Sequence, residues 1–316
     1  MAGVTRDDVL AAARRIGTDV HRTPVLTSRM LDAQAGRQLF FKCEHLQRTG
    51  SFKLRGALNA VRCLDQARAA RGVITDSSGN FGQSLAAAGA TTGVAVTVVM
   101  PSDAPAVKQA AVRGYGGTIV LCEPTLAARK QTVGRLAEEL GATYISSNDH
   151  PDIIAGQGTA ALELLEEVPD LDAVITSVGG GGLLSGTAVV CAAASPPVAV
   201  YAAEPAGADD TARSLAAGEH LPPRDHKSVA MGLLVGMGQH TWAIIRRDVQ
   251  AALVVDDPQI VSAMRLLWER MKQVVEPSAA VPLAAVLSGA LPDRHRRIGV
   301  VLSGGNVDLG RLPWQT

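Results

Sequence analysis

Residues 171–190 read LDAVITSVGGGGLLSGTAVV, and this stretch decides the fold of the chain. The apolar run LDAVITSV has strand character, a helical run follows it, and between them stand Gly179, Gly180, Gly181 and Gly182. A turn from strand to helix needs one or two glycines and not four. Four glycines let the backbone approach another group closely and point several N–H groups at one anion, at the positive end of the helix behind them. We therefore predict an anion-binding loop, with a plain strand-to-helix turn as the alternative.

On both sides of this loop, short apolar strands alternate with helical segments. The helix at the start of the chain is expected to begin after an N-cap at Thr5 and to end at Gly17. The clearest expected strands are residues 94–101, 118–124, 142–146 and 198–205, and residues 297–306 are expected to be a strand that enters a glycine loop. Strands that alternate with helices of about 10–15 residues favour βαβ units and a parallel sheet. The composition changes near residue 148, which divides the pattern into two halves.

Composition excludes several classes of protein. The chain has 316 residues, of which 47% are hydrophobic and 19% charged, so it is long enough and apolar enough for a large globular core. Lys plus Arg and Asp plus Glu number 30 each, so no net charge attracts a polyanion. Aromatic residues make up only 3%, too few for base-stacking surfaces. No nucleic-acid partner is expected.

Four cysteines lie far apart, at Cys43, Cys63, Cys122 and Cys191. Their spacing matches neither a zinc site nor a disulfide framework, so we expect reduced thiols in a cytoplasmic protein. The charged N-terminus lacks the apolar core of a signal peptide. Nowhere do about 18 uncharged apolar residues run together, so no membrane span is expected.

The kind of anion can be narrowed from the motifs that are missing. The sequence has no GxxxxGK[ST], the loop that cradles a triphosphate. It also lacks the spacing of a dinucleotide GxGxxG with a following acidic residue. The ligand of the four-glycine loop is therefore predicted to carry a single phosphate.

Three further polar loops follow apolar strands, in the segments TDSSGNFGQ (75–83), YAAEPAGADD (201–210) and VVLSGGN (300–306). In doubly wound sheets, ligands bind beyond the carboxyl ends of the strands, so these loops should converge with the glycine loop. Their candidate side chains are Ser77, Ser78, Asn80, Glu204, Asp209, Asp210 and Ser303.

One lysine stands out in the segment KCEHLQRTGSFKLRGALNA, residues 42–60. Lys53 follows Gly-Ser-Phe and opens a run with helical spacing. Most lysines keep their charge in water through a flexible stem. The alternative is a partly buried amine whose pKa is lowered, as a nucleophilic lysine requires.

These motifs together resemble the fold-type II pyridoxal-phosphate enzymes, which are tryptophan synthase β-like, and within them the serine/threonine dehydratase and serine racemase group. The resemblance runs nearly end to end through the motifs RTPVLTS, TGSFKLRGA, SSGNFGQ, AGQGT, GGGGLLSG, AAEPAGADD, WERMK, EPSAA and LSGGNVD. It implies an α/β fold of two three-layer α/β/α domains with a cleft between them. We expect residues 1–71 and 148–316 to form a large domain that binds the cofactor. Residues 72–147 would form a small, mobile domain on the substrate side.

The resemblance also implies the cofactor, pyridoxal 5'-phosphate, and the residues that hold it. Lys53 would form a Schiff base with its aldehyde, Phe52 would pack near its ring, and Asn80 would bind the ring hydroxyl. Ser303 would face the pyridine nitrogen. The phosphate would be held by Gly179, Gly180, Gly181 and Gly182.

Substrate and metal sites follow from the same resemblance. Ser77, Ser78, Asn80 and Phe81 would lie beside an amino-acid substrate, and Ser78 would be the acid and base on the cofactor face opposite Lys53. A divalent cation, Mg²⁺ or Ca²⁺, would be bound by Glu204, the carbonyl of Ala208 and Asp210. Carboxylates suit such hard cations, although an acidic turn in solvent is the alternative. A homodimer is implied as well.

Two positions depart from the pattern of the relatives. Phe81 stands where relatives most often have histidine, and Met231 where serine racemase has an acidic residue. Both changes would make the substrate pocket less polar, which favours threonine or a larger β-hydroxy amino acid such as phenylserine. The alternative is that Phe81 packs into the core.

The function implied by this likeness is that of an ammonia-lyase. It would eliminate the β-hydroxyl of L-threonine or L-serine and release a 2-oxo acid and ammonia. The alternatives are an amino-acid racemase, a β-replacement synthase, and a cofactor-binding protein without turnover.

Overall fold

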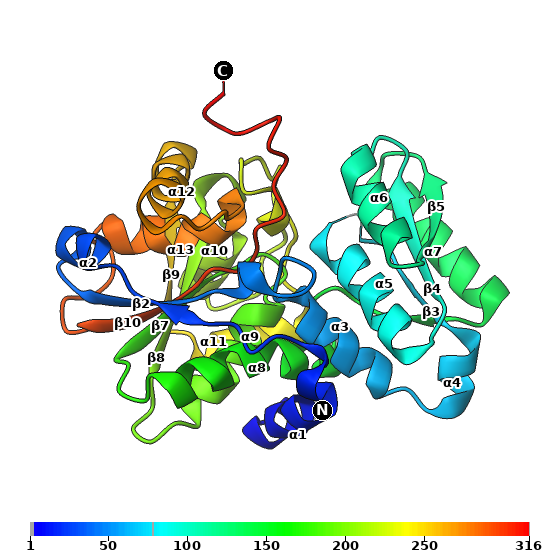
Figure 1. Ribbon diagram of the computed structural model, residues 1–316, viewed down its shortest axis with the longest axis horizontal. Coiled ribbons are helices and arrows are strands. Elements are labelled where there is room, and N and C mark those ends of the chain that lie inside the picture. The colour runs from blue at the N-terminus through cyan, green and yellow to red at the C-terminus, as the bar shows by residue number, and fades with distance from the viewer. Residues whose placement is uncertain (1–2, 78, 316) are drawn as a thin grey trace.

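The computed structural model describes residues 3–77 and 79–315, which form two β-sheets with helices on both faces of each (Figure 1). The larger sheet has six strands in the spatial order β1-β2-β10-β7-β8-β9. Only the β1–β2 pair is antiparallel, and the other neighbours are parallel. These strands are β1 (Val25–Leu26), β2 (Gln38–Lys42), β7 (Ala173–Ser177), β8 (Ala199–Pro205), β9 (Ala251–Val255) and β10 (Arg297–Val301).

Successive residues of the central strands face opposite layers of helices. Val174 lies in the core on one face, and Ile175 lies in the core on the other. Because both faces are covered, these strands are apolar throughout rather than alternating with polar residues. The first layer contains α1 (Arg6–Ile16), α8 (Pro151–Glu167), α9 (Gly182–Ala192) and α11 (Gln239–Asp248). The second contains α2 (Arg29–Ala35), α12 (Asp257–Met271) and α13 (Pro277–Leu287).

The smaller sheet has four parallel strands in the order β5-β4-β3-β6. Val98 of β4 packs toward α5, and its neighbour Val99 packs with the core residues under α7. The strands are β3 (Val73–Thr75), β4 (Val96–Pro101), β5 (Thr118–Cys122) and β6 (Thr143–Tyr144). The helices of this part are α4 (Gln66–Arg71), α5 (Asn80–Thr92), α6 (Ala106–Gly114) and α7 (Leu126–Leu140).

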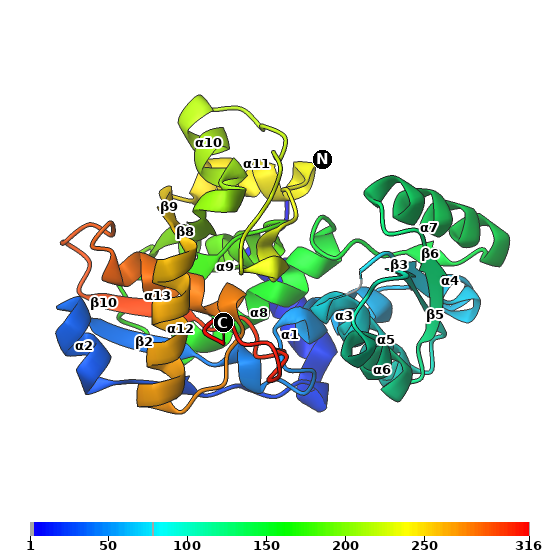
Figure 2. The same ribbon diagram turned by 90° about the horizontal axis from the view of Figure 1, so that it is seen from above.

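Helix α3 (Lys53–Arg62) joins the two parts, because it packs against α8 of the larger part and against α5 of the smaller part (Figure 2). Every residue of this helix from Leu54 to Val61 is buried, including the polar Arg55 and Asn59. The remaining helices are α10 (Asp210–Ala217) and the short 3₁₀ segments η1 (Gly17–Asp19), η2 (Glu44–Leu46), η3 (Ala206–Ala208) and η4 (Met231–Leu233).

Several expectations from the sequence are confirmed. Thr5 caps α1 in a reciprocal capping box with Asp8, and Gly17 follows the last residue of that helix. The parallel α/β architecture with two sheets is also as predicted. All four cysteines are free thiols. The division into domains at residues 71/72 and 147/148 stays a prediction. In the described part of the chain, no helix is both long enough and apolar enough to cross a membrane.

Candidate active site

Lys53 is the first residue of α3, and its amine lies near two aromatic rings. Its Nζ is 5.0 Å from the centre of the Phe52 ring and 5.9 Å from that of Phe81. Nζ donates a hydrogen bond of 2.9 Å to the carbonyl oxygen of Ser147. The amine therefore points toward the segment that follows β6 and not into solvent.

Burial lowers the pKa of Lys53 to about 8, and the nearby Glu276 carboxylate opposes this shift only in part. Desolvation disfavours the charged form of an amine, which is why a partly buried lysine gives up its proton more easily. With a pKa of about 8, roughly one amine in ten is neutral at pH 7. This is the property expected of a nucleophilic lysine.

The four-glycine loop joins β7 to α9 and leaves no room for side chains. Gly181 has φ of +84° at the N-cap of α9, a conformation that favours glycine. A Cβ at Gly179 would stand 2.9 Å from the backbone of Leu233, and one at Gly180 would stand 2.3 Å from the Asn148 side chain. The Asn148 amide donates to the Gly180 carbonyl at 2.8 Å. Bare backbone N–H groups at the start of a helix form a cradle that fits a phosphate.

Ser147 and Asn148 bring the lysine and the glycine loop together. Lys53 bonds to Ser147, and the next residue, Asn148, bonds to the loop. No sequence pattern pointed to Ser147 or Asn148, because they follow a strand of only two residues.

Asn80 lies in a chain of polar side chains that crosses from the smaller part to the larger. As the first residue of α5, it donates from Nδ2 to Oε1 of Glu276 at 2.8 Å. Its Oδ1 accepts from Asn306 at 2.9 Å, and Asn306 also donates to the Thr49 carbonyl at 2.8 Å. Glu276 and Asn306 belong to the quoted motifs EPSAA and LSGGNVD, but no role was expected for them. Because both residues lie in those motifs, the motifs were the sequence signal that could have identified them.

Burial raises the pKa of Glu276 to about 7, while the hydrogen bond from Asn80 and the charges of Lys108 and Lys53 oppose the shift. The carboxyl group is thus close to half protonated near neutral pH. It stands near Lys53, so the charges of the two groups depend on one another.

Ser303 follows β10 and is 4% exposed. Its carbonyl accepts from the backbone N–H of Phe52 at 3.1 Å, next to Lys53. The adjacent Ser51 has a buried hydroxyl with no hydrogen-bond partner among the described residues, and its backbone pairs with that of Gly304. The C-terminal end of β10 and the start of α3 therefore form one wall of the candidate site.

The predicted substrate loop is described only in part. Ser77 follows β3 and is partly buried, whereas Ser78 lies outside the described residues. Phe81 is 1% exposed and belongs to the apolar cluster between α3 and α5, although its ring faces the Lys53 amine. Met231, in η4, is 68% exposed. Phe81 therefore packs in the core with its ring near the amine, and its place beside a substrate stays a prediction.

The three predicted metal ligands lie at the end of β8 and the start of α10. Both carboxylate oxygens of Glu204 accept backbone N–H groups, from Thr211 and Ala212, at 2.9 Å each. Burial raises the pKa of Glu204 to about 7. Asp210 has one oxygen 3.1 Å from Nε2 of His226 and the other buried without a hydrogen-bond partner in the described structure. Ala208 is buried in η3.

These groups fit a cation only in part, because Asp210 offers one open oxygen while the oxygens of Glu204 already accept backbone donors. Across residues 3–77 and 79–315, no cluster of three or more His, Cys, Asp or Glu side chains could hold a metal ion. The cation stays a prediction.

Comparison with known proteins identifies the family. The model of the family described as "Pyridoxal-phosphate dependent enzyme" matches residues 16–304. The chain belongs to this family. The glycine cradle and the lysine with the lowered pKa fit its cofactor, because one can hold a phosphate and the other can react with an aldehyde.

Several similar proteins show which members of this family the chain resembles. It is 47% identical to the serine racemase of Dictyostelium discoideum, over 99% of this chain and 98% of the relative. The crystal structure of serine racemase from that organism covers 98% of this chain and 100% of its own, with a TM-score of 0.94. The β-hydroxyaspartate dehydratase of Paracoccus denitrificans is 46% identical over 98% of each chain. The T.th. threonine deaminase is 44% identical, with a TM-score of 0.90 and coverage of 96% of this chain and 99% of its own. The chain is thus a fold-type II pyridoxal-phosphate enzyme of the serine racemase, hydroxyaspartate dehydratase and threonine deaminase family.

Proposed function

We propose that this enzyme removes water from a β-hydroxy amino acid and releases a 2-oxo acid and ammonia. L-Threonine would give 2-oxobutanoate, and L-serine would give pyruvate. The observation that carries the proposal is the Lys53 amine, which has a pKa of about 8 and lies next to the segment that contacts the four-glycine loop. An amine with this pKa can be neutral when it attacks an aldehyde and can later accept a proton.

Pyridoxal phosphate, when bound, withdraws electrons from Cα of an amino acid attached at its aldehyde and so acidifies the Cα proton. The backbone N–H groups of Gly179, Gly180, Gly181 and Gly182 would hold its phosphate, and Asn80 and Ser303 would lie beside its ring. Lys53 would accept the Cα proton. The β-hydroxyl would leave as water with the proton that Lys53 had accepted, and hydrolysis of the released dehydrated product would give the 2-oxo acid and ammonia.

Ser303 favours elimination of the β-hydroxyl over the slower return of a proton to Cα. A hydroxyl group, unlike a carboxylate, brings no negative charge to keep a proton on the ring nitrogen. Pyridoxal phosphate would then supply weaker electron withdrawal, and Ser303 would in this way favour prompt departure of the β-hydroxyl over return of the proton to Cα.

A racemase is the second candidate, and one observation favours it. The chain is 47% identical to a serine racemase over almost its whole length. Racemisation needs a second acid on the face opposite Lys53, and the hydroxyl of Ser78 is our candidate for that role. The relatives that act on hydroxyaspartate and threonine instead support the dehydratase. The ring of Phe81 beside the amine favours threonine or a larger apolar β-hydroxy amino acid over hydroxyaspartate.

One set of assays distinguishes these reactions. The wild-type enzyme, loaded with pyridoxal phosphate, is incubated in D₂O with L-serine, L-threonine, phenylserine or hydroxyaspartate. A dehydratase releases ammonia and keto acid in equal amounts, whereas a racemase exchanges the Cα proton for deuterium without releasing ammonia. If a thiol is added to the assay, only a β-replacement synthase would join it to the dehydrated substrate.

Lys53→Ala should abolish turnover and the visible absorbance of the covalently bound cofactor, because it removes the amine that would form that bond. The absorbance spectrum and the ammonia assay check both. A Lys53→Ala protein that still turns over substrate would refute the proposed role of Lys53.

We further propose that Asp210, Glu204 and the Ala208 carbonyl bind Mg²⁺ or Ca²⁺ and that the enzyme is a homodimer. The open oxygen of Asp210 supports the first. Mg²⁺ or Ca²⁺ should then raise the melting temperature of the wild type but not that of Asp210→Asn. An equal effect on both proteins would contradict this site, and sedimentation of a monomer would contradict the dimer.

A further inference from the structure

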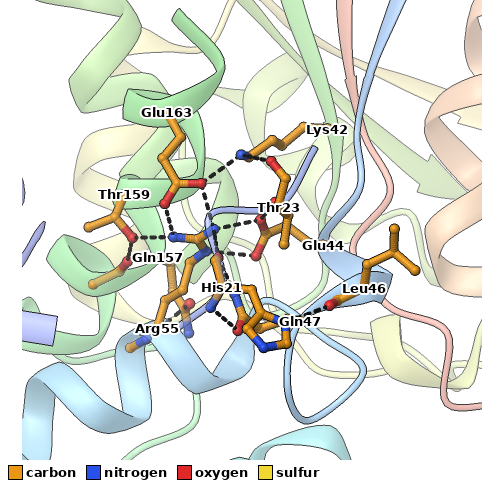
Figure 3. Close-up of polar contacts among 12 residues, drawn as sticks. His21, Thr23, Lys42, Glu44, Leu46, Gln47, Arg55, Gln157, Thr159 and Glu163 are labelled. Atoms are coloured by element: carbon orange, nitrogen blue, oxygen red, sulfur yellow. Dashed lines mark hydrogen bonds and ion pairs between the residues drawn. The ribbon is translucent and has the colours of Figure 1, made fainter. Parts of the chain in front are cut away.

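A second group of charged side chains lies behind the candidate site, buried where four elements meet (Figure 3). Lys42 ends β2, Glu44 begins η2, Arg55 lies in the first turn of α3, and Glu163 lies on α8. The side chains of Lys42, Glu44 and Arg55 are fully buried, and that of Glu163 is 14% exposed. Two positive and two negative charges balance within this cluster.

Arg55 is at its centre, and all of its N–H donors have acceptors. Its guanidinium donates to both oxygens of Glu44, at 2.7 and 2.8 Å, and to both oxygens of Glu163, at 2.7 and 2.8 Å. Longer bonds reach the Thr159 hydroxyl at 3.2 Å and the His21 carbonyl at 3.3 Å. A planar fork with five donors can satisfy this geometry, and the single ammonium of a lysine cannot.

The partners of Arg55 are themselves held by further bonds. Lys42 donates to Glu163 at 2.6 Å and to the carbonyl of Thr23 at 2.7 Å. The Thr23 hydroxyl donates to Glu44. Burial alone would raise the pKa of Glu44, but the charge and hydrogen bonds of Arg55 hold it below its usual range. Glu44 therefore stays charged near neutral pH.

Stability alone does not explain such a cluster. Removing two charge pairs from water costs free energy that their attraction often only offsets, and well-packed apolar residues can do as well. What buried ion pairs can add is a fixed geometry, because any displacement leaves a charge without its partner.

The geometry that this cluster fixes is the first turn of α3. That helix begins at Lys53 without a side-chain N-cap, and an uncapped first turn is prone to fraying. Arg55 lies two residues after Lys53. A Cβ on Gly156 of α8 would stand 2.6 Å from Cα of Gly56 and 2.7 Å from the Arg55 carbonyl, so the two helices touch at this turn.

We propose that Arg55 is a positioning residue: its guanidinium, clamped between Glu44 and Glu163, fixes the first turn of α3 and thereby holds the Lys53 amine at the cofactor site. This proposal rests on the proposed role of Lys53. Loss of the clamp frees the first turn, so the amine moves away from the aromatic rings and water reaches it.

The test compares Arg55→Lys with a matched control on the same helix. Arg62, the last residue of α3, donates to the carbonyls of Arg15 and Ile16 at 2.6 and 3.1 Å and pairs with Asp19. Arg62→Lys therefore removes a similar fork from the far end of α3. Three quantities are measured for each protein: the Kd for pyridoxal phosphate, the melting temperature, and the pH dependence of acylation of Lys53 without cofactor.

Arg55→Lys should raise the Kd for pyridoxal phosphate by about tenfold, a typical coupling within one network. The midpoint of Lys53 acylation should move from about 8 toward that of an exposed lysine. Arg62→Lys should leave both quantities at the wild-type values. If Arg55→Lys and Arg62→Lys both lose thermal stability and share the wild-type Kd and acylation midpoint, Arg55 has only a structural role and the proposal is wrong.

Glu163→Gln gives a second test if Arg55→Lys does not fold. It keeps the shape of the side chain at the member of the cluster that is partly exposed, and it leaves Arg55 paired with Glu44. Glu163→Gln should raise the Kd for pyridoxal phosphate and the midpoint of Lys53 acylation, both by less than Arg55→Lys does. Wild-type values of both quantities would overturn the proposal. If the wild type itself binds no cofactor at Lys53, the proposed function fails. This result differs from the variant results that would support or overturn the role of Arg55.

Discussion

Lys53 and Glu276 influence each other's charge, although they are far apart in the sequence and only the fold brings them together. Burial lowers the pKa of the Lys53 ammonium to about 8 and raises that of the Glu276 carboxyl to about 7. In each case the shift favours the neutral form, and the opposite charge of the partner opposes it. A change at either residue should therefore alter the protonation of the other.

Glu276→Gln should lower the pKa of Lys53 below its present value of about 8. The substitution removes a negative charge that favours the ammonium form, while the burial that favours the neutral amine remains. The expected change is a few tenths of a pH unit up to about one unit. The pH dependence of Lys53 acylation in the protein without cofactor measures it, and an unchanged or higher midpoint would contradict the coupling.

The same variant should change how stability depends on pH. The pKa of Glu276 is raised in the folded protein, so its contribution to stability is fully present below about pH 4.5 and is lost as the pH rises through about 7. The melting temperature of the wild type, relative to that of Glu276→Gln, should therefore fall between pH 4.5 and pH 7. A constant difference across that range would show that Glu276 has no raised pKa.

For single residues, the sequence identified those that lie in motifs. It did not identify the residues that contact them in the folded protein. The neighbours of Lys53, Asn80 and Ser303 in the chain were informative because each stands in a compact motif. The contacts from Asn80 to Glu276 and from Lys53 to Ser147 join segments that are distant in sequence, so they depend on the packing of whole elements. Ser78 lies outside the described residues, and its role stays a prediction.

The crossing of α3 and α8 leaves no room for a side chain at its two glycines. Gly56 and Gly156 face each other there, and a Cβ at either would approach backbone atoms within 3 Å. Because the Arg55 carbonyl is one of those atoms, a side chain on α8 would displace the turn that carries Lys53.

Gly156→Ala should destabilise the protein by about 1–3 kcal/mol, as overpacking of a core does, and should weaken binding of pyridoxal phosphate. Gly134→Ala is the matched control, because Gly134 is exposed within α7 and a Cβ there would meet no atom within 4 Å. That control should gain up to about 1 kcal/mol from higher helix propensity. Chemical denaturation measures both, and equal stabilities for the two variants would contradict close packing of α3 on α8.

The patterns in the sequence predicted every strand except β9, and they predicted the shorter or fully buried helices less well. Helix α13 was missed, because it is buried along almost its whole length and has Pro282 in its interior. A helix covered on all sides shows no polar face, so its sequence has no period of 3.6 residues to detect. By contrast, the sequence of α12 has a clear amphipathic pattern, because one of its faces meets solvent.

In the molecule as a whole, the candidate site takes residues from the parts that surround both sheets. Asn80 belongs to the smaller part, the four-glycine loop belongs to the larger, and Lys53 lies on the helix between them. A ligand that contacts all three should therefore hold the two parts together, since binding to the folded form alone stabilises what it contacts.

Pyridoxal phosphate should slow amide hydrogen exchange in α5 and in α9 alike, because each helix begins with a residue of the candidate site, Asn80 or Gly182. The comparison is between the protein with and without cofactor, and Lys53→Ala under the same conditions is the control. Protection confined to α9 and the glycine loop would show that the smaller part does not contact the cofactor.

The position of β10 has a consequence for how the chain is made. This strand lies between β2 and β7 in the larger sheet, yet it is the last strand to be synthesised. Until it leaves the ribosome, β2 and β7 have no partner between them, whereas every strand of the smaller sheet has already emerged. The smaller part can therefore fold during translation, while the larger sheet can close only after β10 has emerged. A nascent chain stalled before Arg297 would expose the unpaired edges of both strands, and chaperones would find their binding sites there.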